Sequence, residues 1–130
     1  MGERRILVIG SQCERLQRLS FLPGLAEELY AVLTDPERGS CVPAIGDHGL
    51  LLDPSVEEAH NALEAAFERA SKDEATLLLA FIGHGQFAEG DEDFYFLPRD
   101  ASHPPTSRKA LHLVQVIREC LQLGRRPLMA

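Results

Sequence analysis

Residues 75–86 read ATLLLAFIGHGQ, an apolar run that leads into a histidine between two glycines. From Thr76 to Ile82 the chain is apolar on both faces, and a glycine ends the run. A short run of this kind is typical of a central strand in a parallel sheet that helices cover on both sides. We therefore expect Gly83, His84 and Gly85 to lie at the carboxyl edge of such a sheet, where ligands and reactive groups gather in open α/β folds.

The first half of the chain predicts two more strands and a helix. Arg5–Gly10 is a short β-branched run, and Leu50–Asp53 is a second strand candidate that follows a loop over residues 37–49. Between the strands, apolar residues recur at helical spacing, with Pro23 in the first turn. This spacing predicts an amphipathic helix whose buried face contains Leu22, Leu25, Ala26, Leu29, Val32 and Leu33.

The second half continues the alternation. Ser55 and Glu58 form a capping-box pattern, which predicts the start of a second helix. The buried face of that helix is expected to contain Val56, Ala59, Leu63, Ala66, Phe67 and Ala70. Segment 93–97 predicts a short strand, segment 102–107 a loop, and segment 111–121 a last helix that Gly124 and Pro127 end. Residues 128–130 resemble the beginning of another buried strand.

This order of elements predicts the fold class. Strands that alternate with helices imply right-handed crossovers and an α/β fold, with an open, mostly parallel sheet and helices on both faces. We expect residues 1–130 to form a single domain. We also expect this domain to be incomplete, because the sequence stops where the next buried strand begins.

The composition excludes several classes of protein. The net charge of -7 argues against a nucleic-acid partner, because such proteins usually carry a clustered basic face. The longest apolar run, Leu77–Ile82, is far shorter than the ~20 residues of a membrane span, and the N-terminus lacks a signal-peptide pattern. Three cysteines without CxxC spacing predict reduced thiols. We expect a cytoplasmic protein without a membrane partner.

His84, at the end of the predicted strand Thr76–Ile82, suits acid–base chemistry. An imidazole has an ordinary pKa near 6.5, so it both accepts and returns a proton near neutral pH. Gly83 permits a tight turn, while Gly85 leaves room for a substrate carbonyl and offers its N–H as an oxyanion donor. The structural alternative is a turn whose histidine ring is hydrogen-bonded to the backbone.

The stretch FIGHGQFAEGDEDFYFLPRDA, residues 81–101, resembles the histidine-bearing part of bacterial caspase-like cysteine peptidases. This resemblance implies the caspase-hemoglobinase fold, with His84 as the catalytic histidine and Gly85 in the oxyanion site. It also implies a peptide or protein substrate and no cofactor. In that family the nucleophilic cysteine ends the next central strand, so we expect the nucleophile in a segment beyond residue 130.

The three cysteines present do not match the family's nucleophile. Cys120 lies in a helical pattern among apolar residues, which is typical of a buried thiol. Cys13 follows the first strand and is expected at the same sheet edge as His84, where a reactive thiol is conceivable. Cys41 lies beside Pro43 in the long loop and carries less signal.

Other charged residues give weaker signals. Arg15 and Arg18 occupy the loop where caspases place a substrate-binding arginine, and Arg18 is the candidate for reading an acidic side chain. The acidic run 91–93 is the pattern of a solvated surface. No metal site is expected, because the other histidines lack ligand spacing; they are His48, His60, His103 and His112.

Two other functions stay open from the sequence. One is a non-catalytic caspase-like module for interaction or regulation, and the other is an α/β domain that binds a small ligand without a standard phosphate loop. If the sheet is incomplete, its exposed strand edge predicts self-association or pairing with a companion chain that carries the remaining strands. Eleven of the 13 basic residues are arginine, which suggests a GC-rich bacterial source.

Overall fold

A parallel sheet runs through the middle of the molecule. The computed structural model describes residues 3–87, 94–101, 111–122 and 128–129. β2 and β3 pair with one edge of β1, β4 pairs with the other edge, and β8 pairs with the start of β4, all in parallel. The strands are β1 (Arg4–Ser11), β2 (Val42–Pro43), β3 (Leu50–Leu52), β4 (Thr76–Gly83) and β8 (Leu128–Met129). The predicted parallel α/β sheet is confirmed.

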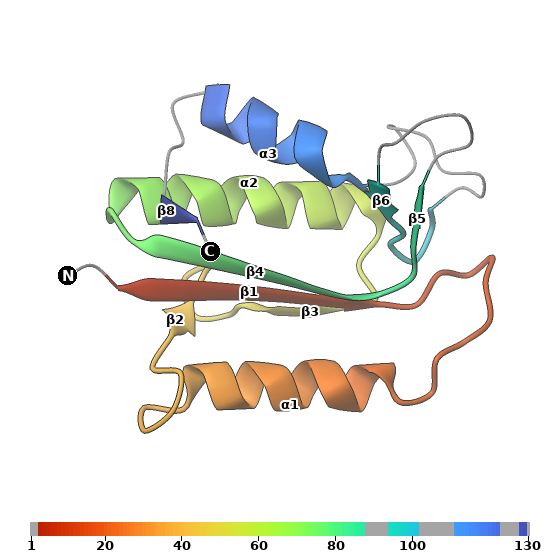
Figure 1. Ribbon diagram of the computed structural model, residues 1–130, viewed down its shortest axis with the longest axis horizontal. Helices are drawn as coiled ribbons and strands as arrows, with labels where there is room; N and C mark the ends of the chain where they lie inside the picture. Colours follow the sequence, from red (N-terminus) through yellow and green to blue (C-terminus); the bar gives the residue numbers. More distant parts are fainter. Residues whose placement is uncertain (1–2, 88–93, 102–110, 123–127, 130) are drawn as a thin grey trace.

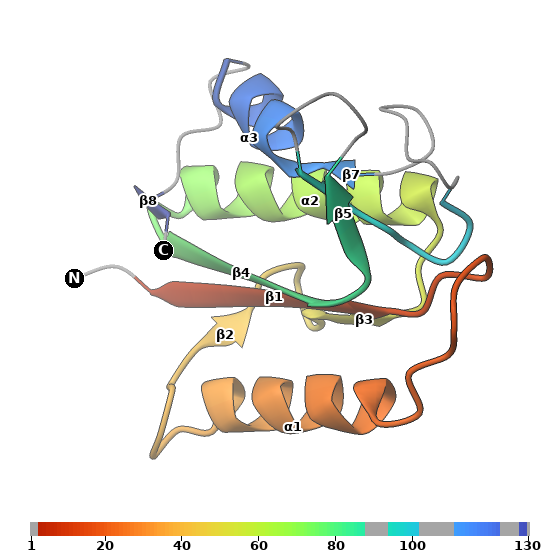
Figure 2. The ribbon, with the colours of Figure 1, turned by 45° about the vertical axis from the view of Figure 1, so that its right-hand side comes forward.

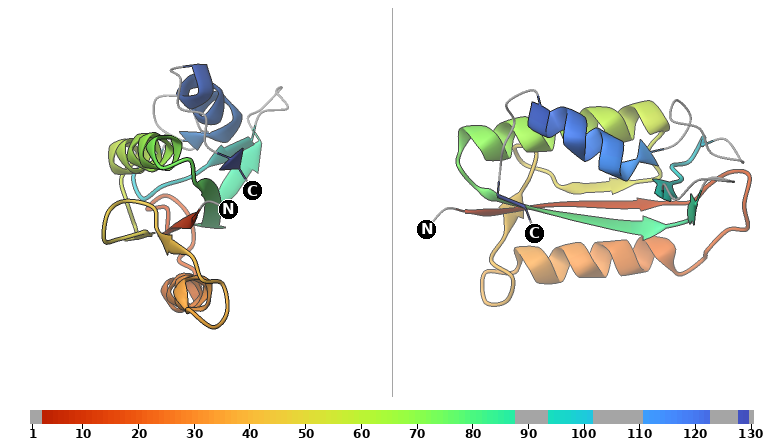
Figure 3. Two further views of the ribbon diagram at one scale, coloured as in Figure 1. Left: turned by 90° about the vertical axis from the view of Figure 1, so that its left-hand side faces the viewer. Right: turned by 45° about the horizontal axis from the view of Figure 1, so that its top comes forward.

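Helices cover both faces of this sheet, as the sequence predicts. Helix α1 (Leu22–Thr34) lies on one face, and helices α2 (Val56–Lys72) and α3 (Leu113–Gln122) lie on the other (Figure 1). The end-on view in Figure 3 shows these three layers. Helix α2 begins with the predicted capping box, in which Ser55 and Glu58 each accept a hydrogen bond from the other's backbone N–H.

The alternation of side chains along β1 builds two cores. Ile6 and Val8 pack on the α1 side, whereas Leu7 and Ile9 pack on the α2 side. All four side chains are at most 1% exposed. The two strands stay in register over eight residues, from the Arg4–Thr76 pair to the Ser11–Gly83 pair. Because β1 and β4 end level with each other, the loops that follow them start side by side.

A second, smaller sheet stands at the carboxyl edge of the first. It is antiparallel and contains β5 (Gly85–Phe87), β6 (Phe94–Phe96) and β7 (Leu111–His112) in that order. Figure 2 shows β5 turning away from the end of β4. The small sheet packs on the main one through Phe96, whose ring centroid lies 5.1 Å from that of Phe81.

Some expectations from the sequence are wrong in detail. Leu25 and Val32 of α1 are 45% and 40% exposed, although the spacing predicted them to be buried. This helix carries apolar residues around most of its circumference, so periodicity alone could not identify the side that faces the sheet. β2 was predicted as loop, and Leu111 was predicted as helical but pairs with Phe96 in β7.

The predicted last strand begins as expected. Leu128 and Met129 form β8 and pair with Thr76 and Leu77. The strand expected over 93–97 is β6. The loop 102–107 and the helix-ending residues Gly124 and Pro127 lie outside the described residues.

Candidate functional site

Three parallel strands end at one edge of the main sheet, next to the small sheet. β1 ends at Ser11, β3 at Leu52 and β4 at Gly83, on the right-hand side of Figure 1. The segments that follow these strands carry the candidate residues of the sequence analysis. In open α/β sheets this edge is where functional side chains converge.

His84 lies between the two sheets with its ring half-buried. Its Nε2 atom is 2.9 Å from the backbone carbonyl oxygen of Gln17, in the loop after β1. A carbonyl oxygen only accepts hydrogen bonds, so the ring donates from Nε2. The neutral ring therefore carries its proton on Nε2 and leaves a lone pair on Nδ1. This hydrogen bond to the backbone is the contact expected of a purely structural histidine. It also orients the ring for proton transfer at Nδ1.

Gly83 is required by the backbone at this point. Its φ of 154° lies in a region that side-chain-bearing residues rarely adopt, and a Cβ built there would overlap the carbonyl oxygen of Ser11. The glycine thus lets β4 stay paired with β1 to its last residue and then turn. This turn places His84 against the loop after β1.

Gly85 is the first residue of strand β5, directly after the turn at Gly83 and His84. It pairs with Phe96, and the N–H of Leu97 donates to the His84 carbonyl over 3.0 Å. Because this bond joins the residues that flank the pair, Gly85 and Phe96 form a non-hydrogen-bonded pair, in which the Gly85 N–H points away from β6. A Cβ at Gly85 would overlap the ring of Phe94, so glycine also makes room for that ring.

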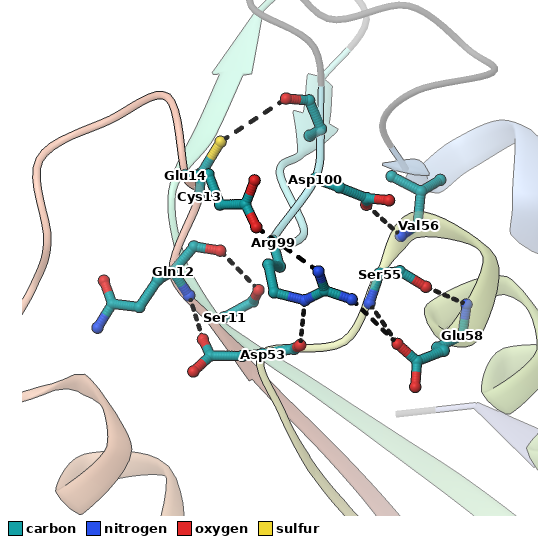
Figure 4. A network of polar contacts seen from close by, with 11 residues as sticks. Ser11, Gln12, Cys13, Glu14, Asp53, Ser55, Val56, Glu58, Arg99 and Asp100 are labelled. Atoms are coloured by element: carbon teal, nitrogen blue, oxygen red, sulfur yellow. Dashed lines mark hydrogen bonds and ion pairs between the residues drawn. The ribbon is translucent and has the colours of Figure 1, made fainter.

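The loop after β1 is held by Gln12. The side-chain amide of Gln12 donates to the Leu19 carbonyl over 2.7 Å and accepts from the Leu19 N–H over 2.8 Å. The backbone N–H of Gln12 donates to the carboxylate of Asp53, at the end of β3, over 2.8 Å. Figure 4 shows the contact between Gln12 and Asp53.

Arg99, after β6, links the small sheet to the main one. Its Nε donates to the Asp53 carbonyl over 3.1 Å, and its terminal nitrogens lie 3.5 Å from carboxylate oxygens of Glu14 and Glu58 (Figure 4). The next residue, Asp100, accepts a hydrogen bond from the first N–H of α2, that of Val56. These contacts join the ends of β1, β3 and β6 to the start of α2.

Glu58 is the acid in this network whose titration is clearly affected. The backbone N–H of Ser55 stabilises its charged form most strongly, followed by the Ser55 side chain. The positive charge of Arg99 acts in the same direction. Together these contacts hold the pKa of Glu58 below its ordinary value.

A cavity of about 230 Å³ opens beside the loop after β1. Its lining includes Cys13, Arg18, Asp53 and Arg99. Arg18 is exposed, whereas Arg99 is held by two carboxylates. The structure thus brings Arg18 to the same sheet edge as His84, Gly83 and Gly85.

The described cysteines are poorly placed to attack a substrate. Cys13 is 2% exposed, with its sulfur 3.9 Å from the Ala101 carbonyl oxygen, and Cys41 is 6% exposed. Both are free thiols. Cys120 lies in α3, but its side chain is outside the described part of the chain, as are residues 91–93 and His103.

The remaining histidines are scattered over the surface and the small sheet. His48 lies 3.3 Å from the carboxylate of Asp47, and this contact lowers the pKa of Asp47. His60 is on α2, and the His112 ring stacks on Tyr95 in the small sheet. Among the described residues, no group of three or more potential metal ligands lies together.

Three residues of this site were missed by the sequence analysis. Gln17 contributes only its carbonyl oxygen, which has no sequence signal. Gln12 and Arg99 act through contacts with residues far along the chain, including Asp53 and Glu14. The position of Gln12 directly after a buried strand was the one signal that pointed to the sheet edge.

Comparisons with known proteins add no family to these observations. No protein-family model matches the chain, and a search of curated proteins found no match. Within the described residues, no helix combines the length and apolar character needed to cross a membrane.

Proposed function

We propose that this chain is the histidine-bearing part of a caspase-like cysteine endopeptidase. The observation that carries the proposal is the His84 ring at the carboxyl end of β4, with Nε2 bonded to the Gln17 carbonyl. A backbone carbonyl at Nε2 orients the ring and takes the proton of that nitrogen in a hydrogen bond, so Nδ1 is the atom that exchanges protons.

The register of β8 supports the expected position of the nucleophile. β8 is parallel to β4, and Met129 pairs with Leu77. If this strand continues in the same register, the position level with Gly83 is six residues past Met129. A cysteine just after that point, beyond residue 130, would end its strand beside His84, as the resemblance to caspases implies.

The mechanism follows from these positions. His84 takes the proton of the cysteine thiol at Nδ1, and the resulting thiolate attacks the carbonyl carbon of the substrate peptide bond. The Gly85 N–H donates to the oxyanion, and His84 returns the proton to the leaving amine as the C–N bond breaks. Water then attacks the thioester carbon and gives one proton to His84. The C–S bond breaks, His84 returns the proton to the cysteine sulfur, and the acid product leaves.

Arg18 supplies the proposed contact with the substrate. Arg18 is an exposed residue that lines the cavity beside the loop after β1, so its guanidinium is available to an acidic substrate side chain. The volume of this cavity, about 230 Å³, is smaller than the ~300–1,000 Å³ of ordinary small-molecule sites, which disfavours a small ligand bound at this position. The buried free thiols Cys13 and Cys41 suit the proposed cytoplasmic location.

The test is to label the full gene product with a peptidyl acyloxymethyl ketone and to map the modified residue by mass spectrometry. The proposal predicts modification of one cysteine outside residues 1–130, and loss of labelling in His84→Ala. Labelling of Cys13 or Cys41, or labelling that persists in His84→Ala, contradicts the peptidase assignment. A full product without a cysteine at the end of the next strand favours the non-catalytic module.

A further inference from the structure

The loop that supplies the Gln17 carbonyl is closed by a single side chain. Both polar groups of the Gln12 amide bond to the backbone of Leu19, at 2.7 and 2.8 Å, across a separation of seven residues. A glutamine amide offers one acceptor and one donor group, and here both are used on the same partner residue. The two ends of the loop are thereby joined.

This closure is built on the rigid part of the fold. Gln12 directly follows β1 and is only 7% exposed. Its N–H donates to Asp53, whose own N–H donates to the Gly10 carbonyl over 2.8 Å. Asp53 adopts a left-handed conformation, with φ of 51°, which turns its carboxylate toward Gln12. The loop is therefore anchored to the ends of β1 and β3.

The His84 partner lies close to the closed end of the loop. Gln17 is two residues before Leu19, and its side chain is exposed to solvent. Between Gln12 and Leu19 the chain has no helix or strand, and its first part is held by backbone hydrogen bonds from Glu14 to Arg99 and from Leu16 to Cys13. The direction of the Gln17 carbonyl therefore depends on how the following end, at Leu19, is held. Without the Gln12 amide, the Leu19 N–H would lose its acceptor and the Leu19 carbonyl would keep only the Leu22 N–H, at 3.1 Å. The Gln17 carbonyl would then lose its fixed direction.

We propose that Gln12 is a positioning residue for His84. It acts through Leu19 and the Gln17 carbonyl to keep the histidine proton on Nε2 and the lone pair on Nδ1. The catalytic meaning of this role rests on the proposed peptidase function, but the proton position can be measured without any activity. The hydrogen bonds of Gln12 go to Asp53 and Leu19, so its proposed effect on His84 is indirect.

The experiment measures the His84 tautomer by long-range ¹H–¹⁵N NMR, above the pH at which the ring is protonated. In the wild-type chain we expect a pyrrole-like shift for Nε2 and a pyridine-like shift for Nδ1. Gln12→Ala should move both nitrogens toward averaged shifts. Gln12→Glu keeps the acceptor for the Leu19 N–H but loses the donor, so it should give an intermediate result. The Gln12→Glu variant also keeps the test possible if Gln12→Ala does not fold.

The matched control is Gln17→Ala, which removes a glutamine side chain from the same loop but keeps the carbonyl that His84 uses. This variant should retain the wild-type shifts. Wild-type shifts in both Gln12 variants, or equal changes in the Gln17 control, overturn the positioning role. In the full gene product, Gln12→Ala should lower kcat about tenfold or more with less effect on KM. A tautomer change in a product without peptidase activity would reject the proposed function while leaving the positioning role standing.

Discussion

The Nε2 atom of His84 lies 2.9 Å from the backbone carbonyl oxygen of Gln17, which joins the end of β4 to the loop after β1. This contact fixes both the direction of the ring and the nitrogen that carries its proton. The consequences for stability, association and activity are separable by experiment.

Gly83 is expected to be the least replaceable glycine of the site. Gly83→Ala should lower the free energy of unfolding by about 2–3 kcal/mol, because a Cβ both strains the backbone and overlaps Ser11. Gly24→Ala is the control, since a Cβ there meets nothing within 4 Å on an exposed turn of α1. It should raise stability by roughly 0.5–1 kcal/mol. Urea unfolding measures both, and equal effects would reject the backbone argument.

Arg99 should stabilise the junction between the two sheets. Arg99→Ala removes contacts to Asp53, Glu14 and Glu58, and we expect a loss of roughly 1–2 kcal/mol in urea unfolding. Arg38→Ala is the control, because that arginine makes one exposed pair with Asp35 at 4.0 Å. Its effect should be below about 0.5 kcal/mol. A loss no larger for Arg99→Ala than for the control would show that the junction does not depend on this side chain.

The Glu58 carboxylate, which caps α2, is expected to make the stability of the protein depend on pH. The folded-state pKa of Glu58 is lowered, chiefly by the Ser55 N–H, so its stabilising effect is present above the ordinary glutamate pKa of about 4.3. The effect should disappear as the pH falls through the lower folded value. Melting temperatures of wild type and Glu58→Gln should therefore differ at pH 7 and converge well below pH 4.

The control for this titration is Glu57→Gln. It removes a carboxylate from the same first turn of α2 but leaves the Ser55 hydrogen bonds to Glu58 in place. A gap between wild type and Glu58→Gln that stays constant down to low pH would contradict the linkage.

The edge of β4 that faces away from β1 is expected to make this chain associate with another chain. β8 pairs with Thr76 and Leu77 only, and from Leu78 to Gly83 the described residues provide no strand on that edge. Unpaired apolar edges recruit other strands. Residues 1–130 should therefore self-associate, or copurify with a companion chain whose strand pairs with this edge, and native mass spectrometry distinguishes these cases. A monomer at micromolar concentration in sedimentation would be the contrary result.

The sheet could be predicted because its strands carry their own signals. The run from Leu77 to Ile82 and the run from Ile6 to Ile9 are apolar and are each followed by glycine, and Ser55 with Glu58 marks the start of α2. β2 could not be predicted, because its two residues include Pro43 and gain their pairing only from the neighbouring β1. The orientation of α1 depends equally on tertiary packing.

The site was predictable only in part, for the same reason. The position of His84 follows from the end of a strand. Its partner is a carbonyl oxygen, and every residue has one. The supporting contacts of Gln12 with Asp53 and of Arg99 with Glu58 each join residues that are 41 positions apart in the sequence. Local patterns carry no information about such pairs.

The most direct test of the central claim is the peptidase activity of the full gene product, measured on a library of fluorogenic peptides, with and without His84→Ala. We expect the wild type to cleave peptides and His84→Ala to lose at least about 10²-fold in kcat/KM while its melting temperature stays nearly unchanged. Turnover that survives the loss of His84 in a folded protein would contradict the assignment of this histidine as the catalytic base.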